Sequence, residues 1–187
     1  MILLIELFEQ YGKWKVLSYI LANPTTKVHI KKLGRTLDIS PATASSALKE
    51  LERLKMVNKD IVANVHLYYL NEQNPAIASL KRFYSIIRIT SLDPEKEFLR
   101  VDPEIFSLAI FGSFANGTYD EHSDIDILIL SETEKGIFIP IIKDLEERLK
   151  KTVNITVLKL HHWRNLAKKG DAFYDSIVAN HVLLYGS

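Results

Sequence analysis

The sequence lacks cysteine altogether, which excludes disulfide bonds and metal sites built on thiolates. It also lacks an apolar run of about 18 residues, so no membrane-spanning helix is expected. Residues 1–8 are apolar, but they carry no basic segment and no small-residue cleavage site, and they are interpreted as packed structure rather than a signal peptide. These absences are typical of a cytoplasmic protein that has no membrane partner.

Charge is unevenly divided along the chain, although the net charge is only +1. Residues 1–90 carry 13 Lys and Arg against 7 Asp and Glu, whereas residues 91–187 carry 11 against 16. This division predicts two domains with different partners, because a basic half can face a polyanion such as DNA. The excess of positive charge in residues 1–90 is also compatible with ordinary surface charge, so charge alone does not decide whether this half binds DNA.

The first half of the sequence carries helix signals and turn signals in alternation. Ser40 is a good helix cap and Pro41 suits a first helical position, so a helix is expected to begin there. Ala63 and Asn64 separate two β-rich runs and form the expected tip of a hairpin. The expected elements are helices over residues 12–22, 30–37 and 41–55, a minor strand over residues 27–30 and a hairpin over residues 57–70.

Residues 28–70 resemble the winged helix-turn-helix family through IKKLGRTLDIS, PATASSALKELERLKMV and a hairpin that ends in HLYYLN. The resemblance implies that the third helix enters the major groove of DNA, with short hydroxyls near its start and cations further along. Winged helices also serve as dimerisation or protein-docking modules, so both roles stay open. The residues expected to contact DNA are Ser40, Thr43, Ser45, Ser46, Lys49 and Arg53.

Residues 74–92 are expected to form a linking helix. They separate a winged helix-turn-helix domain at residues 1–73 from a second domain at residues 93–187. The apolar side chains of the linking segment can pack on either domain or form the interface of a homodimer.

Two aspartates stand at the start of an apolar β run in the second half. Side chains at positions i and i+2 of a strand share one face, so Asp124 and Asp126 are expected to point together. Two converging carboxylates repel each other unless a cation joins them or one is protonated. Hard oxygen ligands of this kind suit Mg²⁺ or Mn²⁺. The pair is therefore a candidate metal site.

A Gly-Ser turn precedes these aspartates by ten residues and follows another apolar β run. Gly112 allows a phosphate to approach the backbone, while the N–H and hydroxyl groups of Ser113 can donate to it. A metal beside a phosphate-binding turn is the equipment for phosphoryl or nucleotidyl transfer.

This combination resembles the G-S-x10-D-x-D signature of the minimal nucleotidyltransferase branch of the DNA polymerase β superfamily, over residues 108–185. The resemblance implies an α+β chain whose second domain has a small mixed sheet with flanking helices. It implies that Asp124 and Asp126 ligate the metal, and that Gly112, Ser113 and Ser123 bind ATP or another nucleoside triphosphate. A hydroxyl would then attack the α-phosphate, and pyrophosphate would leave.

The third catalytic carboxylate of that branch lies on a later strand, in a run such as V-D-φ-V. The matching run here is VNITV, so Asn154 stands where the acid is expected. An amide oxygen can ligate a metal, but it cannot accept a proton near neutral pH. Three outcomes stay open: a slow transferase, a transferase that uses another base, and a nucleotide-binding pseudoenzyme.

Three functions compete at this point. The first is an enzyme that transfers a nucleoside monophosphate, AMP from ATP, onto a hydroxyl of a small molecule or a protein; the resemblance implies a HEPN-type toxin as the protein acceptor. The second is a DNA-binding regulator whose second domain senses a nucleotide without chemistry. The third is an interaction scaffold, which would have no physical need for clustered acids.

Overall fold

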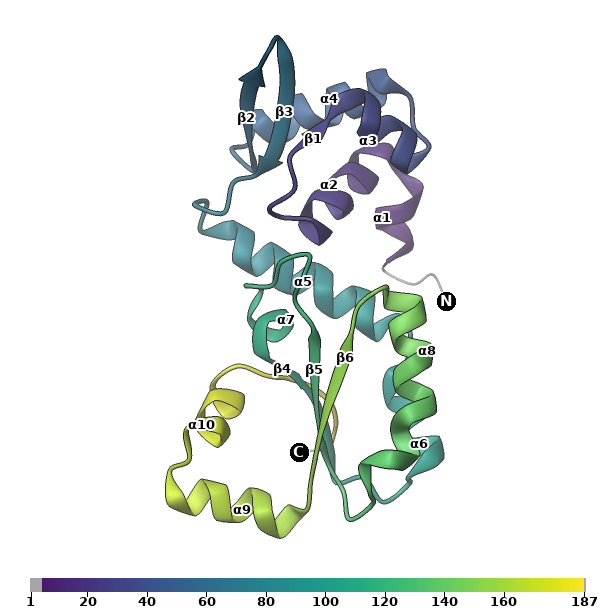
Figure 1. The fold of residues 1–187 in the computed structure, drawn as a ribbon, viewed down its shortest axis with the longest axis vertical. Coiled ribbons are helices and arrows are strands. Elements are labelled where there is room, and N and C mark those ends of the chain that lie inside the picture. The colour runs from purple at the N-terminus through teal and green to yellow at the C-terminus, as the bar shows by residue number, and fades with distance from the viewer. Residues whose placement is uncertain (1–4, 187) are drawn as a thin grey trace. The chain divides into compact units, whose positions relative to one another are not determined.

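The computed structural model of the protein describes residues 5–186 (Figure 1). The chain divides into two compact units, Met1–Tyr84 and Ser85–Ser187, and each is described by itself. Their boundary lies inside α5 (Ala76–Thr90), within the segment predicted to link two domains. Across residues 5–186, no helix combines the length and apolarity needed to cross a membrane. Residues 1–4 of the apolar start lie outside the described part.

The first unit consists of helices followed by an antiparallel hairpin. Its three strands form one sheet in the order β1-β3-β2, and both pairings are antiparallel. From α2 onward the elements follow the order expected from the sequence, whereas the short helix α1 was not expected. They are α1 (Glu6–Gln10), α2 (Gly12–Ala22), β1 (Val28–His29), α3 (Ile30–Leu37), α4 (Pro41–Arg53), β2 (Val57–Val62) and β3 (Val65–Leu70).

Local signals in the sequence explain where these elements begin and end. The side chain of Ser40 accepts a hydrogen bond of 3.0 Å from the Thr43 N–H, which satisfies one of the free donors at the start of α4. Ala63 and Asn64 both adopt left-handed backbone, with φ of 46° and 63°. Positive φ at both central residues matches the right-handed twist of the strands in a two-residue hairpin.

The core of the first unit is built where α2, α3 and α4 pack together. Val16, Leu33 and Leu48 are almost completely buried, one from each helix. Tyr68 of β3 is also buried, so the sheet contributes to the same interior. Burial of this apolar surface stabilises the unit and fixes which side of α4 remains exposed.

The second unit is an α+β structure around a four-stranded sheet in the order β6-β5-β4-β7. β5 pairs with β6 in parallel, whereas β4 pairs antiparallel with both β5 and β7. The predicted small mixed sheet with flanking helices is confirmed. The elements are α6 (Pro94–Val101), β4 (Ser107–Phe111), α7 (Gly112–Asn116), β5 (Ile125–Leu130), a 3-10 turn η1 (Lys135–Phe138), α8 (Ile139–Leu149), β6 (Val153–Leu158), α9 (Leu160–Lys169), α10 (Ala172–Ala179) and β7 (Val182–Gly186).

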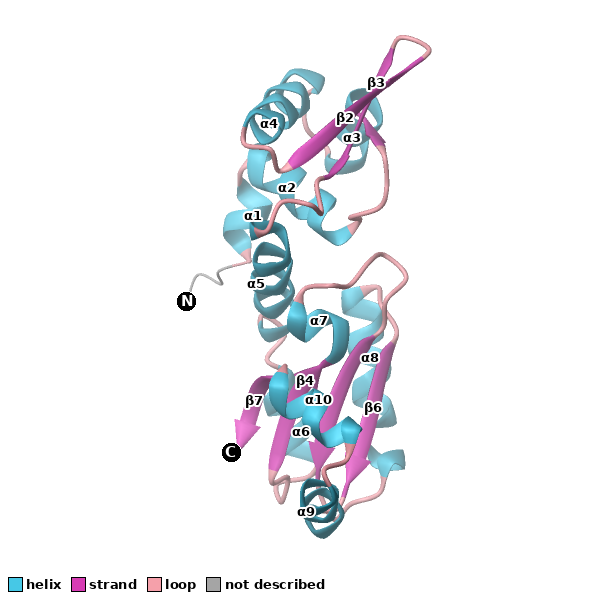
Figure 2. Cartoon of the chain, turned by 90° about the vertical axis from the view of Figure 1, so that its left-hand side faces the viewer, coloured by secondary structure: helices cyan, strands magenta, loops and turns pink. Residues whose placement is uncertain are grey.

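Helices cover both faces of this sheet (Figure 2). Ile127 of β5 belongs to a buried cluster that includes Phe98 of α6 and Leu145 of α8. Leu128 packs on the opposite face in a cluster with Ile177 of α10. A strand that is buried on both faces needs a continuous apolar run, which explains the sequence ILIL. Asp124 precedes this run and is exposed, and Asp126 is only partly buried.

Candidate active site

The turn after β4 brings a glycine against a carboxylate. Phe111, the last residue of β4, pairs with Asp126, so Gly112 lies beside the Asp126 side chain. Gly112 has a φ of +70°, and a Cβ built on it would lie 2.7 Å from Asp126 Oδ2. Glycine is thus favoured at this position twice, by its backbone conformation and by the lack of space.

The two aspartates meet an asparagine from the neighbouring strand. Asp126 pairs with Asn154 across the parallel β5–β6 ladder, and Asn154 Nδ2 donates a hydrogen bond of 3.2 Å to Asp124 Oδ2. Asp124 and Asn154 are exposed, whereas Asp126 is half-buried. The structure therefore gathers Gly112, Asp124, Asp126 and Asn154 at one edge of the sheet.

The electrostatics of this cluster favour a bound cation. Burial raises the pKa of the Asp126 carboxyl above its ordinary value, and the negative charge of Asp124 raises it further. The Asn154 amide acts in the opposite direction, because it donates a hydrogen bond to the charged form. A positive ion would offset the repulsion from Asp124, which is the smaller of the two causes that raise the Asp126 pKa.

The donor set fits a hard divalent cation such as Mg²⁺. Asp124 and Asp126 offer carboxylate oxygens, and the Asn154 side chain can offer its amide oxygen if the amide turns over. Among residues 5–186 no group of three or more Asp, Glu, His or Cys side chains is suited to a metal, so carboxylates supply only two positions here. The cluster thus carries one negative charge fewer than a site with three acids.

Gly112 is the first residue of the short helix α7, which follows β4 directly. The start of α7 receives no hydrogen bond from a capping side chain, so its first N–H groups remain available for an acceptor. Ser113 uses its carbonyl to accept from the N–H groups of Gly117 and Thr118, at 2.9 and 3.0 Å. Within the described chain its hydroxyl has no hydrogen-bond partner.

Ser123 was also predicted to bind the nucleotide. In the structure its side chain forms hydrogen bonds within the loop that precedes Asp124. Its hydroxyl accepts from the Asp120 N–H and donates to Asp120 Oδ1, both at 2.9 Å. The hydrogen bond from Ser123 also lowers the pKa of the Asp120 carboxyl. In this structure Ser123 shapes the loop that carries Asp124.

Lys151, on a different segment, holds the loop that precedes Asp124 in place. No sequence pattern distinguished it from other lysines. Its ammonium donates to the carbonyls of Asp120 and Glu121, at 3.1 and 2.6 Å, and lies 5.7 Å from the centre of the Phe114 ring. Burial, followed by the positive charge of Arg88, lowers the pKa of Lys151. Lys151 therefore positions the segment that leads into Asp124.

The residues predicted to contact DNA divide into two groups on α4. The hydroxyls of Ser40 and Thr43 form a hydrogen bond of 2.8 Å at the start of α4, where Ser40 caps the helix. Ser45 is half-buried. Ser46, Lys49 and Arg53 are exposed, and their three- and four-residue spacing places them on one side of the helix. These three side chains form an exposed cationic and hydroxyl-bearing stripe.

Comparison with known proteins places the second unit in a family. Residues 95–184 match the family model described as the nucleotidyltransferase domain. This part of the chain is therefore a nucleotidyltransferase domain. The gathered residues Gly112, Asp124, Asp126 and Asn154 all lie inside this domain.

Several solved structures match part of this chain at low sequence identity and low TM-score. A toxin–antitoxin structure with AMP-PNP is 21% identical, with a TM-score of 0.38, over 51% of this chain and 73% of that one. Lactococcus lactis ZitR is 20% identical, with a TM-score of 0.37, over 48% and 59%. A complex of the tri-AMPylated Shewanella oneidensis HEPN toxin with the MNT antitoxin is 17% identical, with a TM-score of 0.34, over 52% and 73%. Among curated proteins no match was found.

Proposed function

We propose that this chain is a metal-dependent enzyme that transfers AMP from ATP onto a hydroxyl of a protein or a small molecule. The observation that carries the proposal is the strand register, which gathers Gly112, Asp124, Asp126 and Asn154 within a nucleotidyltransferase domain. Members of this family generally use a nucleoside triphosphate and a divalent metal. The donor set described above fits such a metal.

Each group at the sheet edge has a separate role in this scheme. Asp124 and Asp126 hold the cation, which when bound neutralises charge on the phosphates. The N–H groups at the start of α7 and the Ser113 hydroxyl hold the triphosphate, and Gly112 leaves room for its approach. The acceptor oxygen forms a bond to the α-phosphorus as the bond to pyrophosphate breaks. The hydroxyl proton is lost to water.

Asn154 sets the rate of this reaction. A carboxylate at this position could accept the proton of the attacking hydroxyl, whereas the amide cannot. Its Nδ2 group instead donates to Asp124 and keeps that side chain in place. The enzyme is therefore expected to be slow, with an acceptor whose hydroxyl is positioned well enough to react without a strong base.

The acceptor is proposed to be a hydroxyl on a HEPN-type toxin protein. The first unit is proposed to be a winged helix-turn-helix domain, because the packed helices α2, α3 and α4 precede an antiparallel hairpin. Ser46, Lys49 and Arg53 on α4 would face DNA, with the cations on phosphates or bases.

The enzymatic proposal is tested with ATP labelled with ³²P in the α-phosphate. The protein is incubated with this ATP, Mg²⁺ and a cell extract or a purified HEPN-type toxin, and protein-bound label is counted. Transfer should require Mg²⁺ and should vanish in Asp124→Ala and Asp126→Ala. Asp144→Ala is the matched control, because Asp144 is an exposed carboxylate on α8, paired with Arg148. Equal transfer by all variants would contradict the proposed site.

A second candidate function is a DNA-binding regulator that binds nucleotide without chemistry, and the amide at Asn154 favours it. In this case ATP would bind in the presence of Mg²⁺, but no label would be transferred.

DNA binding is measured by gel shift on random and selected duplexes. The double variant Lys49→Ala and Arg53→Ala should weaken binding and its salt dependence, whereas Lys143→Ala on α8 should not. Unchanged binding would remove α4 from the interface.

A further inference from the structure

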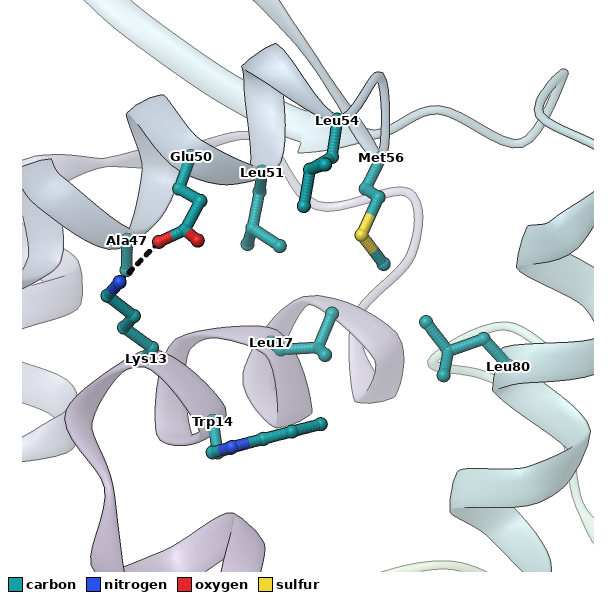
Figure 3. Close-up of a pocket in the computed structure, with 9 residues that line it drawn as sticks. All are labelled: Lys13, Trp14, Leu17, Ala47, Glu50, Leu51, Leu54, Met56 and Leu80. Atoms are coloured by element: carbon teal, nitrogen blue, oxygen red, sulfur yellow. Dashed lines mark hydrogen bonds and ion pairs between the residues drawn. The ribbon is translucent and has the colours of Figure 1, made fainter.

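The first unit contains a cavity that the nucleotide chemistry of the second unit does not use. It has a volume of about 340 Å³, is open to solvent, and is lined by residues of α2, α4, the segment after α4 and α5 (Figure 3). Cavities of this size, mostly apolar with a few polar groups, are typical of small-molecule sites. The lining residues are Lys13, Trp14, Leu17, Ala47, Glu50, Leu51, Leu54, Met56 and Leu80.

The apolar part of the cavity combines a buried floor with an exposed rim. Leu17 and Leu51 are buried beneath it, whereas Trp14 and Leu54 are 42% and 48% exposed. Large apolar side chains that stay this exposed leave surface from which a ligand would displace water. The indole of Trp14 adds a flat wall, which favours an aromatic ligand.

A single ion pair provides the polar end of the cavity. Lys13 and Glu50 are bonded there, at the end opposite Leu80 in the view of Figure 3. The hydrogen bond and charge of Lys13 lower the pKa of Glu50, and the charge of Arg53 lowers it further. Two cations thus act on one carboxylate. The ammonium of Lys13 has donors for a second acceptor besides Glu50.

We propose that this cavity binds a small aromatic carboxylate, with its ring against Trp14 and its carboxylate on Lys13. The ring would cover the exposed rim, and the carboxylate would accept a hydrogen bond from the Lys13 ammonium. The site lies wholly in the first unit, so the proposal stands or fails independently of the nucleotidyltransferase activity.

The experiment uses the full chain labelled with ¹⁵N, because the sequence has only two tryptophans. Trp14 reports on the cavity, while Trp163 on α9 in the second unit serves as the internal reference. The two indole N–H signals are assigned with Trp163→Phe and followed during titration with 2-naphthoate. A saturable shift of the Trp14 signal alone is expected. No shift of that signal at millimolar 2-naphthoate would overturn the proposal.

Charge variants test where the carboxylate binds. Lys13→Met should weaken 2-naphthoate binding by about tenfold, because it removes one charged hydrogen bond. Lys15→Met, which changes the charge equally on the same helix but does not line the cavity, should have no such effect. Binding of the neutral 2-naphthamide should be the same in both variants. An equal loss of 2-naphthoate binding in both lysine variants would contradict the contact with Lys13.

Glu50→Gln provides a test in the opposite direction. Glu50 competes with the ligand for Lys13, so its neutralisation should strengthen 2-naphthoate binding. A structural role of the ion pair alone would produce weaker binding instead, and that result would overturn the proposal. A Trp14 signal that shifts with protein concentration in the absence of 2-naphthoate would show that a second copy of the chain fills the cavity, which would also overturn it.

Discussion

Replacing Gly112 with alanine places a methyl group in the closest contact of the candidate active site. The Cβ would lie 2.7 Å from Asp126 Oδ2, and the backbone would keep a φ of +70°. Either the turn must change its conformation or the Asp126 carboxylate must move. Both responses separate the turn from the carboxylate that is proposed to hold the metal.

A second glycine separates the two contributions to the expected loss of stability, the left-handed backbone and the contact with Asp126. Gly170, at the end of α9, has a φ of +62° but no atom within 4 Å of its added Cβ. Left-handed backbone costs a residue other than glycine about 1–2 kcal/mol, and both alanine variants should lose this much. The contact with the Asp126 carboxylate, which can rotate away, should cost Gly112→Ala about 1 kcal/mol more.

The assay measures stability and metal binding together. Urea unfolding is followed through Trp163, because the other tryptophan, Trp14, lies in the first unit. Mn²⁺ binding is followed by the loss of the free-ion signal in electron paramagnetic resonance. Gly112→Ala should lower Mn²⁺ affinity about 10- to 100-fold, as disturbed supporting contacts do at metal sites. Gly170→Ala should leave that affinity unchanged. Equal losses of stability and equal Mn²⁺ affinity in the two variants would refute the reasoning.

Three further predictions concern the surroundings of the site. Asn154→Asp should raise the rate of label transfer by about tenfold or more, since it restores a proton acceptor; an unchanged rate would mean that Asn154 does not face the nucleophile. The raised pKa of Asp126 means that the folded state holds this proton more tightly than the unfolded state, so stability is lost as pH rises through the range above 3.8. Without metal, Asp126→Asn should therefore be the more stable protein at pH 7 and should lose this pH dependence in urea unfolding. Lys151→Met should cost about 1–2 kcal/mol of unfolding free energy and speed amide exchange at residues 120–124, because it removes two charged hydrogen bonds. The control is Lys150→Met, at the exposed neighbouring residue. Equal amide exchange at residues 120–124 in the two variants would contradict the positioning role of Lys151.

Local sequence signals predict much of this fold because they act within a few residues. Ser40-Pro41 predicts the start of α4, and Ala63-Asn64 predicts the hairpin tip. The resemblance to the G-S-x10-D-x-D signature also predicts that Gly112 and Asp126 belong to one site, although it does not give the distance between them.

Contacts between distant segments could not be predicted in the same way. Lys151 reaches carbonyls about 30 positions earlier, and no periodicity encodes a side chain bound to backbone. Helix α6 is short and was not expected, since its burial depends on packing with α8 rather than on its own pattern. The cavity beside Trp14 likewise depends on how three helices pack, which a single helix pattern does not contain.

The most direct measurement of the central claim compares ATP labelled in the α-phosphate with ATP labelled in the γ-phosphate. Nucleotidyl transfer predicts that α-label alone becomes bound to the acceptor, while γ-label leaves as pyrophosphate, and that both events require Asp126. Acceptor-bound γ-label, or release of γ-label as orthophosphate with no bound α-label, would contradict the account.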